Sequence, residues 1–332
     1  MEQTFSFDDV LIKPKPYSSV SSRKEVNTGI DIYNTRLSIP IISASMSAFD
    51  TLSPDKKEIS WQFAGKLSEL GGMHIFSRAT KFFDRVEAAR SLNAAKNNVG
   101  VAVSLDEFFQ HRKLLEKQDF IVSIDIANGS IISDIHWDSE TPLIIGNFGN
   151  PYVVTRSDLS GNLVFKFGIG SGASCSTRLK TGVGAPQGWL IHKVSKPASK
   201  RNVPVVSDGG VKTNADFSKA IALGADSVMM GYMLASAEDS PWEPVKINDA
   251  WYKPYRGMAS FEEKNTNSHV EGISGFVPFE GKSLSEIVYD LQDGLKSAMS
   301  YSDSKSIDEF KAKTEFIFSP VNDVETGTRL HG

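Results

Sequence analysis

Cysteine is almost absent from this chain, since Cys175 is the single one among 332 residues. An intrachain disulfide and a zinc site built on several thiolates are therefore excluded. Histidine is also scarce, and no two histidines have the four-residue spacing that presents both to one metal on a helix. A catalytic zinc site is accordingly disfavoured by the positions of the six histidines: His74, His111, His136, His192, His269 and His331.

Long hydrophobic runs and a strong charge bias are missing as well. No apolar run approaches the roughly 20 residues that span a bilayer. Residues Met1–Phe5 are polar and acidic, unlike the basic and then apolar start of a secretory signal. The net charge of −4 gives no reason to expect nucleic acid or an anionic membrane as a partner. We therefore expect a cytoplasmic protein that binds neither nucleic acid nor membrane.

Eight short apolar runs predict strands that are buried on both faces. Segments with helical periodicity separate several of them, among them Ile59–Leu70, Phe82–Leu92 and Phe108–Lys117. Strand and helix alternating about eight times predict an α/β fold, a (β/α)8 TIM barrel, with an open doubly wound sheet as the alternative. The predicted strands are Ile39–Ala44, Gly72–Phe76, Val99–Val103, Phe120–Ile124, Pro142–Gly146, Leu163–Phe167, Val203–Ser207 and Ser227–Met230.

The seventh unit shows the pattern most clearly. Thr213–Asp216 has the sequence of a capping box at a helix start, and Gly224 suits the helix end. Between them, Phe217, Ala220 and Ile221 share one helical face.

Three regions lie outside the repeat. Residues 1–38 form an N-terminal extension, and residues 240–283 predict a long irregular excursion after strand eight. The tail begins with a predicted helix, Leu284–Met299. The length suits one barrel with extensions, so we expect a single catalytic domain over residues 1–332 with no inserted domain.

Active sites of such barrels lie on the loops that follow the strands. The loop after strand six runs from Gly168 to Arg178 and contains Gly170, Gly172 and Cys175. Its glycines let backbone groups face a ligand or ion. Cys175 is a buried structural thiol, an incidental one or a nucleophile, and its place at a strand end favours the nucleophile. Thr177, two residues on, is placed to hydrogen-bond what the sulfur attacks.

Further candidate residues follow strands seven and eight. Loops seven and eight of such barrels often hold phosphate on backbone N–H groups. The alternative is a pair of ordinary glycine turns. The excursion adds a glutamate beside a glycine, which suits an acid or base that closes over a substrate. These candidates are Asp208, Gly209, Gly210, Gly231, Tyr232, the run Tyr255-Arg256-Gly257-Met258, and Glu271.

Taken together, these motifs resemble the IMP dehydrogenase and GMP reductase family over nearly the whole chain. The most specific part is the cysteine loop, which continues through Lys180-Thr181-Gly182-Val183-Gly184. That run and Asp125-Ile126-Ala127-Asn128-Gly129 resemble the reductase versions of these motifs. Only ten residues separate Ser260 from Glu271, whereas the dehydrogenases carry a much longer water-activating flap there.

The resemblance implies an NADPH-dependent reductive deamination of GMP to IMP and ammonia. Cys175 is then the nucleophile that forms a thioimidate at C2, with Thr177 and Glu271 managing the protons of the leaving group. Asp208 would hold the ribose. The remaining nucleotide contacts would come from Gly209, Gly210, Gly231, Tyr232, Tyr255, Arg256, Gly257, Met258 and Ser47.

The family also implies contacts beyond the nucleotide. Asp125, Ala127, Asn128 and Arg78 would bind the cofactor. Carbonyls of Gly170, Gly172 and Cys175 would bind a monovalent cation such as K+. The family further suggests a homotetramer.

Several positions depart from the family pattern. Ser47 stands where the family usually has aspartate, and Ala173 replaces a serine that commonly touches phosphate. Ser171 and Ser176 replace a proline and a threonine. IMP dehydrogenase, a related purine nucleotide such as dGMP as substrate, and a non-catalytic nucleotide-binding barrel are the alternatives.

Overall fold

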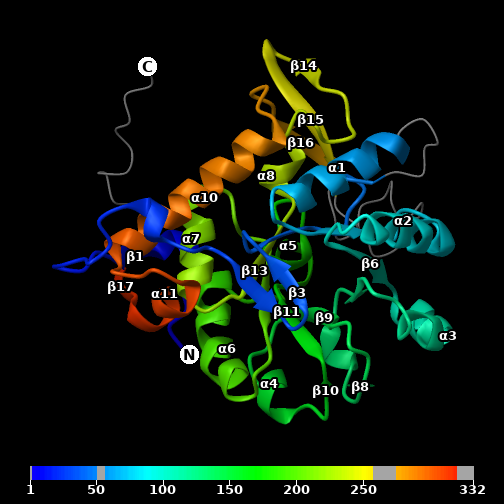
Figure 1. The fold of residues 1–332 in the computed structure, drawn as a ribbon, viewed down its shortest axis with the longest axis horizontal. Coiled ribbons are helices and arrows are strands. Elements are labelled where there is room, and N and C mark those ends of the chain that lie inside the picture. The colour runs from blue at the N-terminus through cyan, green and yellow to red at the C-terminus, as the bar shows by residue number, and fades with distance from the viewer. Residues whose placement is uncertain (1, 51–56, 257–273, 320–332) are drawn as a thin grey trace.

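Eight parallel strands close into a barrel (Figure 1). The structure, a computed structural model, describes residues 2–50, 57–256 and 274–319. The two ends of the sheet meet where Ile42 bridges Met73 and the Ser43 N–H donates to the Met73 carbonyl at 2.9 Å. The barrel prediction is therefore confirmed over the doubly wound alternative. In order around the sheet the strands are β4 (Ile41–Ser43), β13 (Ser227–Met230), β12 (Val205–Asp208), β11 (Leu163–Phe167), β9 (Leu143–Phe148), β7 (Ile121–Asp125), β6 (Val99–Val103) and β5 (His74–Phe76).

Helices follow the strands as the apolar periodicity predicts. The Thr213 cap is present, since the Asp216 N–H donates to Thr213 Oγ1 at 3.2 Å and the Asp216 carboxylate accepts the Thr213 N–H. Phe217, Ala220 and Ile221, which belong to the helix that this cap begins, are fully buried. The helices are α1 (Lys57–Glu69), α2 (Phe82–Ala94), α3 (Leu105–Leu115), α4 (Val153–Arg156), α5 (Thr177–Thr181), α6 (Gln187–Lys200), α7 (Asn214–Ala222), α8 (Tyr232–Ala235), α10 (Leu284–Tyr301) and α11 (Ile307–Lys313).

Part of the N-terminal extension covers the barrel end opposite the expected site, whereas its first residues lie beside the carboxyl-end loops, where a Cβ on Gly210 would be 3.6 Å from the Phe7 ring. Its hairpin, β2 (Ile30–Ile32) and β3 (Thr35–Leu37), carries Tyr33, whose hydroxyl donates to the Leu163 carbonyl at 2.8 Å. Leu163 is the first residue of β11, so the hairpin lies at the amino ends of the strands. The extension also contains η1 (Phe7–Asp9), η2 (Arg23–Glu25) and β1 (Val10–Lys13), and β1 pairs antiparallel with β17 (Glu315–Phe318) from the tail.

The excursion after strand eight is more regular than the sequence suggested. It contains β14 (Val245–Ile247), β15 (Ala250–Arg256) and β16 (Ser274–Pro278), which form an antiparallel sheet that projects from the barrel (Figure 1). The expectation of an irregular segment was wrong for these residues. Aromatic residues and prolines obscured the alternation of β15, whose Lys253 and Tyr255 are buried. The remaining short elements are η4 (Gly129–Ile131), β8 (His136–Trp137) and β10 (Ser160–Gly161).

Candidate active site

The cysteine loop lies at the carboxyl end of β11, between that strand and α5. The Cys175 N–H donates to the Gly172 carbonyl at 3.0 Å, which turns the loop back on itself. Cys175 Sγ lies 3.2 Å from Thr177 Oγ1, and Thr177 is the first residue of α5. The half-buried sulfur is thus next to a hydroxyl that can exchange a proton with it.

Two glycines bring the cysteine loop close to its neighbours. A Cβ on Gly209 would lie 2.8 Å from Ser171 Oγ and 2.9 Å from the Gly172 nitrogen, so a side chain there would collide with the loop. Gly209 and Gly210 also have φ of +79° and +81°, which glycine adopts without strain. The loops after β11 and β12 therefore pack directly against each other.

The loop after β13 meets the excursion sheet at Tyr255. A Cβ on Gly231 would lie only 2.4 Å from the Tyr255 hydroxyl. Tyr255 is buried on β15, its ring centroid is 6.2 Å from that of Tyr232, and its hydroxyl hydrogen-bonds Ser174. Burial raises the pKa of Tyr255, so its phenol stays protonated at neutral pH and can donate to an anion. Tyr255 thus links the loop after β13, which contains the predicted residues Gly231 and Tyr232, to the cysteine loop.

The sequence had suggested that Asp208 starts the loop after strand seven. In the structure Asp208 is the last residue of that strand, β12. Its Oδ2 accepts from Asn147 Nδ2 at 2.6 Å and lies 3.7 Å from Lys166 Nζ. Burial raises the pKa of Asp208, and Lys166 and Asn147 offset part of that rise. The carboxylate keeps 21% of its side-chain surface exposed, which leaves an edge for a ligand.

Asp125 ends β7 on the other side of Lys166. Its Oδ1 is 2.5 Å from Lys166 Nζ, and its Oδ2 accepts from Ser45 Oγ at 2.9 Å. Burial alone would raise the pKa of Asp125, but the charges of Lys166 and Arg78 and these hydrogen bonds hold it below the usual range. Asp125 is therefore an ionised carboxylate at the rim.

Sequence reasoning missed three residues of this network: Ser45, Asn147 and Lys166. A signal was present for Lys166, a polar residue within the otherwise apolar predicted strand Leu163–Phe167, whereas Asn147 directly follows the predicted strand Pro142–Gly146. Both side chains reach the neighbouring carboxylates rather than solvent. Ser45 carried no such signal, since serine is common in loops.

The other predicted residues are less closely joined to this group. Arg78 is exposed and makes no hydrogen bond among the described residues, although its charge acts on Asp125. Ala127 and Asn128 are exposed just beyond β7. Ser47 is buried, and its carbonyl accepts from Trp242 Nε1 at 2.7 Å. Arg256 ends β15, while Gly257, Met258 and Glu271 lie outside the described residues.

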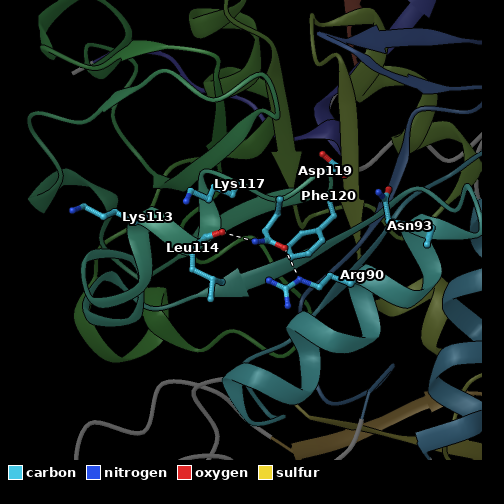
Figure 2. Close-up of a pocket in the computed structure, with 9 residues that line it drawn as sticks. Arg90, Asn93, Lys113, Leu114, Lys117, Asp119 and Phe120 are labelled. Atoms are coloured by element: carbon cyan, nitrogen blue, oxygen red, sulfur yellow. Dashed lines mark hydrogen bonds between the residues drawn. The ribbon is translucent and has the colours of Figure 1, made fainter.

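A separate cavity lies at the opposite end of the barrel. It has a volume of about 730 Å³ and lies between α2, α3 and the start of β7 (Figure 2). Two cations at the cavity wall have structural roles. Arg90 donates to the Gln118 side chain at 2.7 Å. Lys113 is in the last turn of α3, where a positive charge interacts favourably with the helix dipole. Phe120 at its wall directly precedes β7, whereas Asp125 ends that strand. This cavity is therefore not part of the candidate site.

Within residues 2–50, 57–256 and 274–319, no three or more His, Cys, Asp or Glu side chains are grouped so as to hold a metal ion. The helices of these same ranges include none that is both long and apolar enough to cross a membrane.

Comparison with known proteins identifies the family. The model of the IMP dehydrogenase / GMP reductase domain matches residues 4–326. An inosine-5'-monophosphate dehydrogenase of Cryptosporidium parvum is 35% identical, covering 94% of this chain and 91% of that protein. A GMP reductase of Lactobacillus delbrueckii subsp. bulgaricus is 30% identical, covering 93% of each chain, and one of Bacillus cereus is 30% identical, covering 94% of each.

The closed barrel and the family match together place this protein in the class of oxidoreductases that these relatives represent. The chain belongs to the IMP dehydrogenase and GMP reductase family.

Proposed function

We propose that this protein is an NADPH-dependent GMP reductase that converts GMP to IMP and ammonia. The observation that carries the proposal is the contact between Cys175 Sγ and Thr177 Oγ1 beside the glycine loops after β12 and β13. A thiol at a strand end, with a hydroxyl 3.2 Å away, is a nucleophile with a proton partner.

The nucleotide would lie across the loops that converge on Cys175. Asp208 would accept hydrogen bonds from the ribose hydroxyls. N–H groups of Gly209, Gly210 and Gly231 would bind the phosphate, with the Tyr255 phenol as a further donor. This arrangement presents the purine ring to the sulfur.

The proposed reaction has two steps at C2 of the purine. The Cys175 thiolate adds to C2, and the exocyclic amine leaves as ammonia after gaining a proton, which leaves a thioimidate. Thr177 and Glu271 would move the protons of this step. When bound, NADPH supplies a hydride to C2. The C–S bond then breaks, which releases IMP and regenerates the thiolate.

The residues proposed for the cofactor suit a dinucleotide with phosphate groups. Arg78 has an exposed guanidinium with no hydrogen bond among the described residues, so it can pair with a phosphate. Ionised Asp125 lies at the same rim and can accept hydrogen bonds from a ribose or an amide, with Ala127 and Asn128 beyond it. Carbonyls of Gly170, Gly172 and Cys175 would hold a monovalent cation such as K+, although the Gly172 carbonyl already accepts the Cys175 N–H.

The reductase is favoured over the dehydrogenase by the length of the excursion. Ten residues separate Ser260 from Glu271, too few for the long flap that supplies a water-activating pair in dehydrogenases. A reductase needs no such water, because its second step is hydride delivery. The proposal extends to a homotetramer, as the family resemblance suggests, and to a single catalytic domain in the cytoplasm, as the length and composition of the sequence suggest.

One assay tests this function against its alternatives. The wild type should oxidise NADPH with GMP and release IMP and ammonia in equal amounts, and Cys175→Ala should abolish turnover. Parallel reactions with dGMP define the sugar preference. Formation of XMP from IMP and NAD+ at a comparable rate would overturn the reductase assignment. Nucleotide binding without turnover of any substrate would support a non-catalytic barrel instead.

A further inference from the structure

We infer that Lys166 is a positioning residue that holds Asp125 and Asp208, the carboxylates of the two proposed binding subsites, in one charge network. This inference rests on the proposed function, because that function assigns Asp208 to the nucleotide and Asp125 to the cofactor. Lys166 itself would touch neither ligand.

The geometry places one ammonium between two carboxylates. β11 lies between β9 and β12 in the sheet, and Lys166 is its fourth residue. Lys166 Nζ is 2.5 Å from Asp125 Oδ1 and 3.7 Å from Asp208 Oδ2. Each carboxylate has one further donor, Ser45 for Asp125 and Asn147 for Asp208. Two strands that flank different parts of the site are thus joined through one side chain.

Exposure separates the role of Lys166 from that of its partners. The Lys166 side chain has no exposed surface, whereas Asp125 and Asp208 keep 16% and 21% of theirs. A ligand at the rim can therefore reach the carboxylates but not the ammonium. Lys166 can act on a ligand only through Asp125 and Asp208.

The charges explain why the ammonium is needed. A buried lysine stays charged only when it is paired, and here two carboxylates raise the pKa of Lys166 although burial alone would lower it. The three groups sum to a single negative charge, and the exposed Arg78 is the further cation whose charge acts on Asp125 and Lys166. Without the ammonium, two buried carboxylates would face the same space, and their repulsion together with burial would raise the pKa of Asp208 further. A protonated Asp208 accepts ribose hydrogen bonds poorly.

The test measures GMP binding calorimetrically at pH 6 and pH 8 in the absence of cofactor. Lys166→Met keeps a similar side-chain volume but removes the charge. We expect it to weaken GMP binding about tenfold or more at pH 6, the size of losing hydrogen bonds to a charged acceptor. The loss should be smaller at pH 8 than at pH 6, because a higher pH favours the ionised form of Asp208, whereas wild-type affinity should change less between the two pH values. The KM for NADPH should rise in parallel, because Asp125 loses the same partner.

Two variants serve as controls. Lys166→Arg keeps the cation and should restore wild-type binding at both pH values. Lys219→Met removes another buried ammonium, one that donates to the Phe7 carbonyl at 2.9 Å rather than to Asp125 or Asp208, and should not make GMP binding depend on pH. Circular dichroism measures whether each variant folds. If Lys166→Met does not fold, it is replaced by the double variant Lys166→Met/Asp125→Asn, which removes one charge of each sign. The double variant should still bind GMP more weakly than the wild type, since Asp208 has lost its cation.

The failures of the two proposals are distinguishable. Unchanged GMP affinity at both pH values in folded Lys166→Met would overturn the role of Lys166 while the GMP reductase assignment stands. Unchanged affinity in the double variant would do the same where that variant is used. A wild type that neither binds nor turns over GMP would overturn the proposed function and this inference together.

Discussion

Cys175 can be followed without interference because the chain has no other cysteine. Its sulfur is half-buried beside Thr177, in the place that the proposed nucleotide would cover. Iodoacetamide should therefore label the protein once, and GMP at ten times its Kd should slow labelling about tenfold. Mass spectrometry measures both the stoichiometry and the rate.

The matched control for this labelling is Cys175→Ala, which should take up no label. Labelling of the wild type at the same rate with and without saturating GMP would instead indicate a thiol outside the nucleotide site.

At this scale the sequence located some site residues better than others. Cys175 and the glycines could be found because position at a strand end and backbone freedom are visible in the chain. Lys166 stands out as a lysine in an apolar strand, but its role was hidden because hydrophobic periodicity does not say which partner the side chain reaches. Its partners, Asp125 and Asp208, are 41 and 42 residues away, so only the closed barrel shows the network.

Elements are joined by Arg85, a buried residue of α2. Its guanidinium donates to the Ala102 carbonyl at 2.9 Å, to the Thr80 carbonyl at 2.7 Å, and to Glu107 at 2.6 Å. Glu107 is also the capping-box residue of α3, where it accepts the Ser104 N–H. One side chain thus ties α2 to the end of β6 and the start of α3.

Arg85→Met should lower the free energy of unfolding by about 3 kcal/mol, because it leaves buried carbonyls without a donor. Urea unfolding measures the loss. Arg36→Met is the control, since Arg36 pairs with Asp31 on the surface and its removal should cost less than about 1 kcal/mol. Equal losses in the two variants would contradict the importance assigned to the buried contacts.

Element prediction succeeded where both faces of a strand were apolar. All eight barrel strands were found, with ends that differ by up to two residues, because strands buried on both faces carry continuous apolar runs. The excursion sheet was not found. Its strands have one exposed face, and Trp251 and Phe276 are apolar residues on exposed surface. Such a pattern does not separate strand from loop.

Function and stability occupy opposite ends of the whole molecule. The candidate site is built from the carboxyl ends of the strands, whereas the β2–β3 hairpin covers their amino ends. This division is general for such barrels. The barrel must also close between β4 and β5, the two ends of the sheet order, where a bridge between Ile42 and Met73 joins the backbones.

His74 strengthens this closure through its side chain. His74 Nδ1 on β5 lies 2.8 Å from Ser43 Oγ on β4, and the same oxygen accepts the Ile75 N–H at 3.3 Å. The ring is fully buried, with Phe76 at 4.6 Å between ring centroids, and Nε2 has no partner among the described residues. Burial lowers the pKa of His74 to about 3, so the folded protein requires the neutral ring.

Acid should therefore open the barrel through this residue. In the unfolded chain the pKa of histidine is about 6.5, so as the pH falls the unfolded state binds the proton first. The stability that depends on neutral His74 is complete above that pH and declines as the pH falls from about 6.5 toward 3. Between pH 7.5 and 5.5, His74 should lower the free energy of unfolding by about 1.4 kcal/mol. Urea unfolding at the two pH values measures this difference, and His74→Gln, whose amide can still bond Ser43 but does not titrate, should lose it. If His74→Gln and the wild type show the same pH dependence, another group controls the acid sensitivity of the closed barrel.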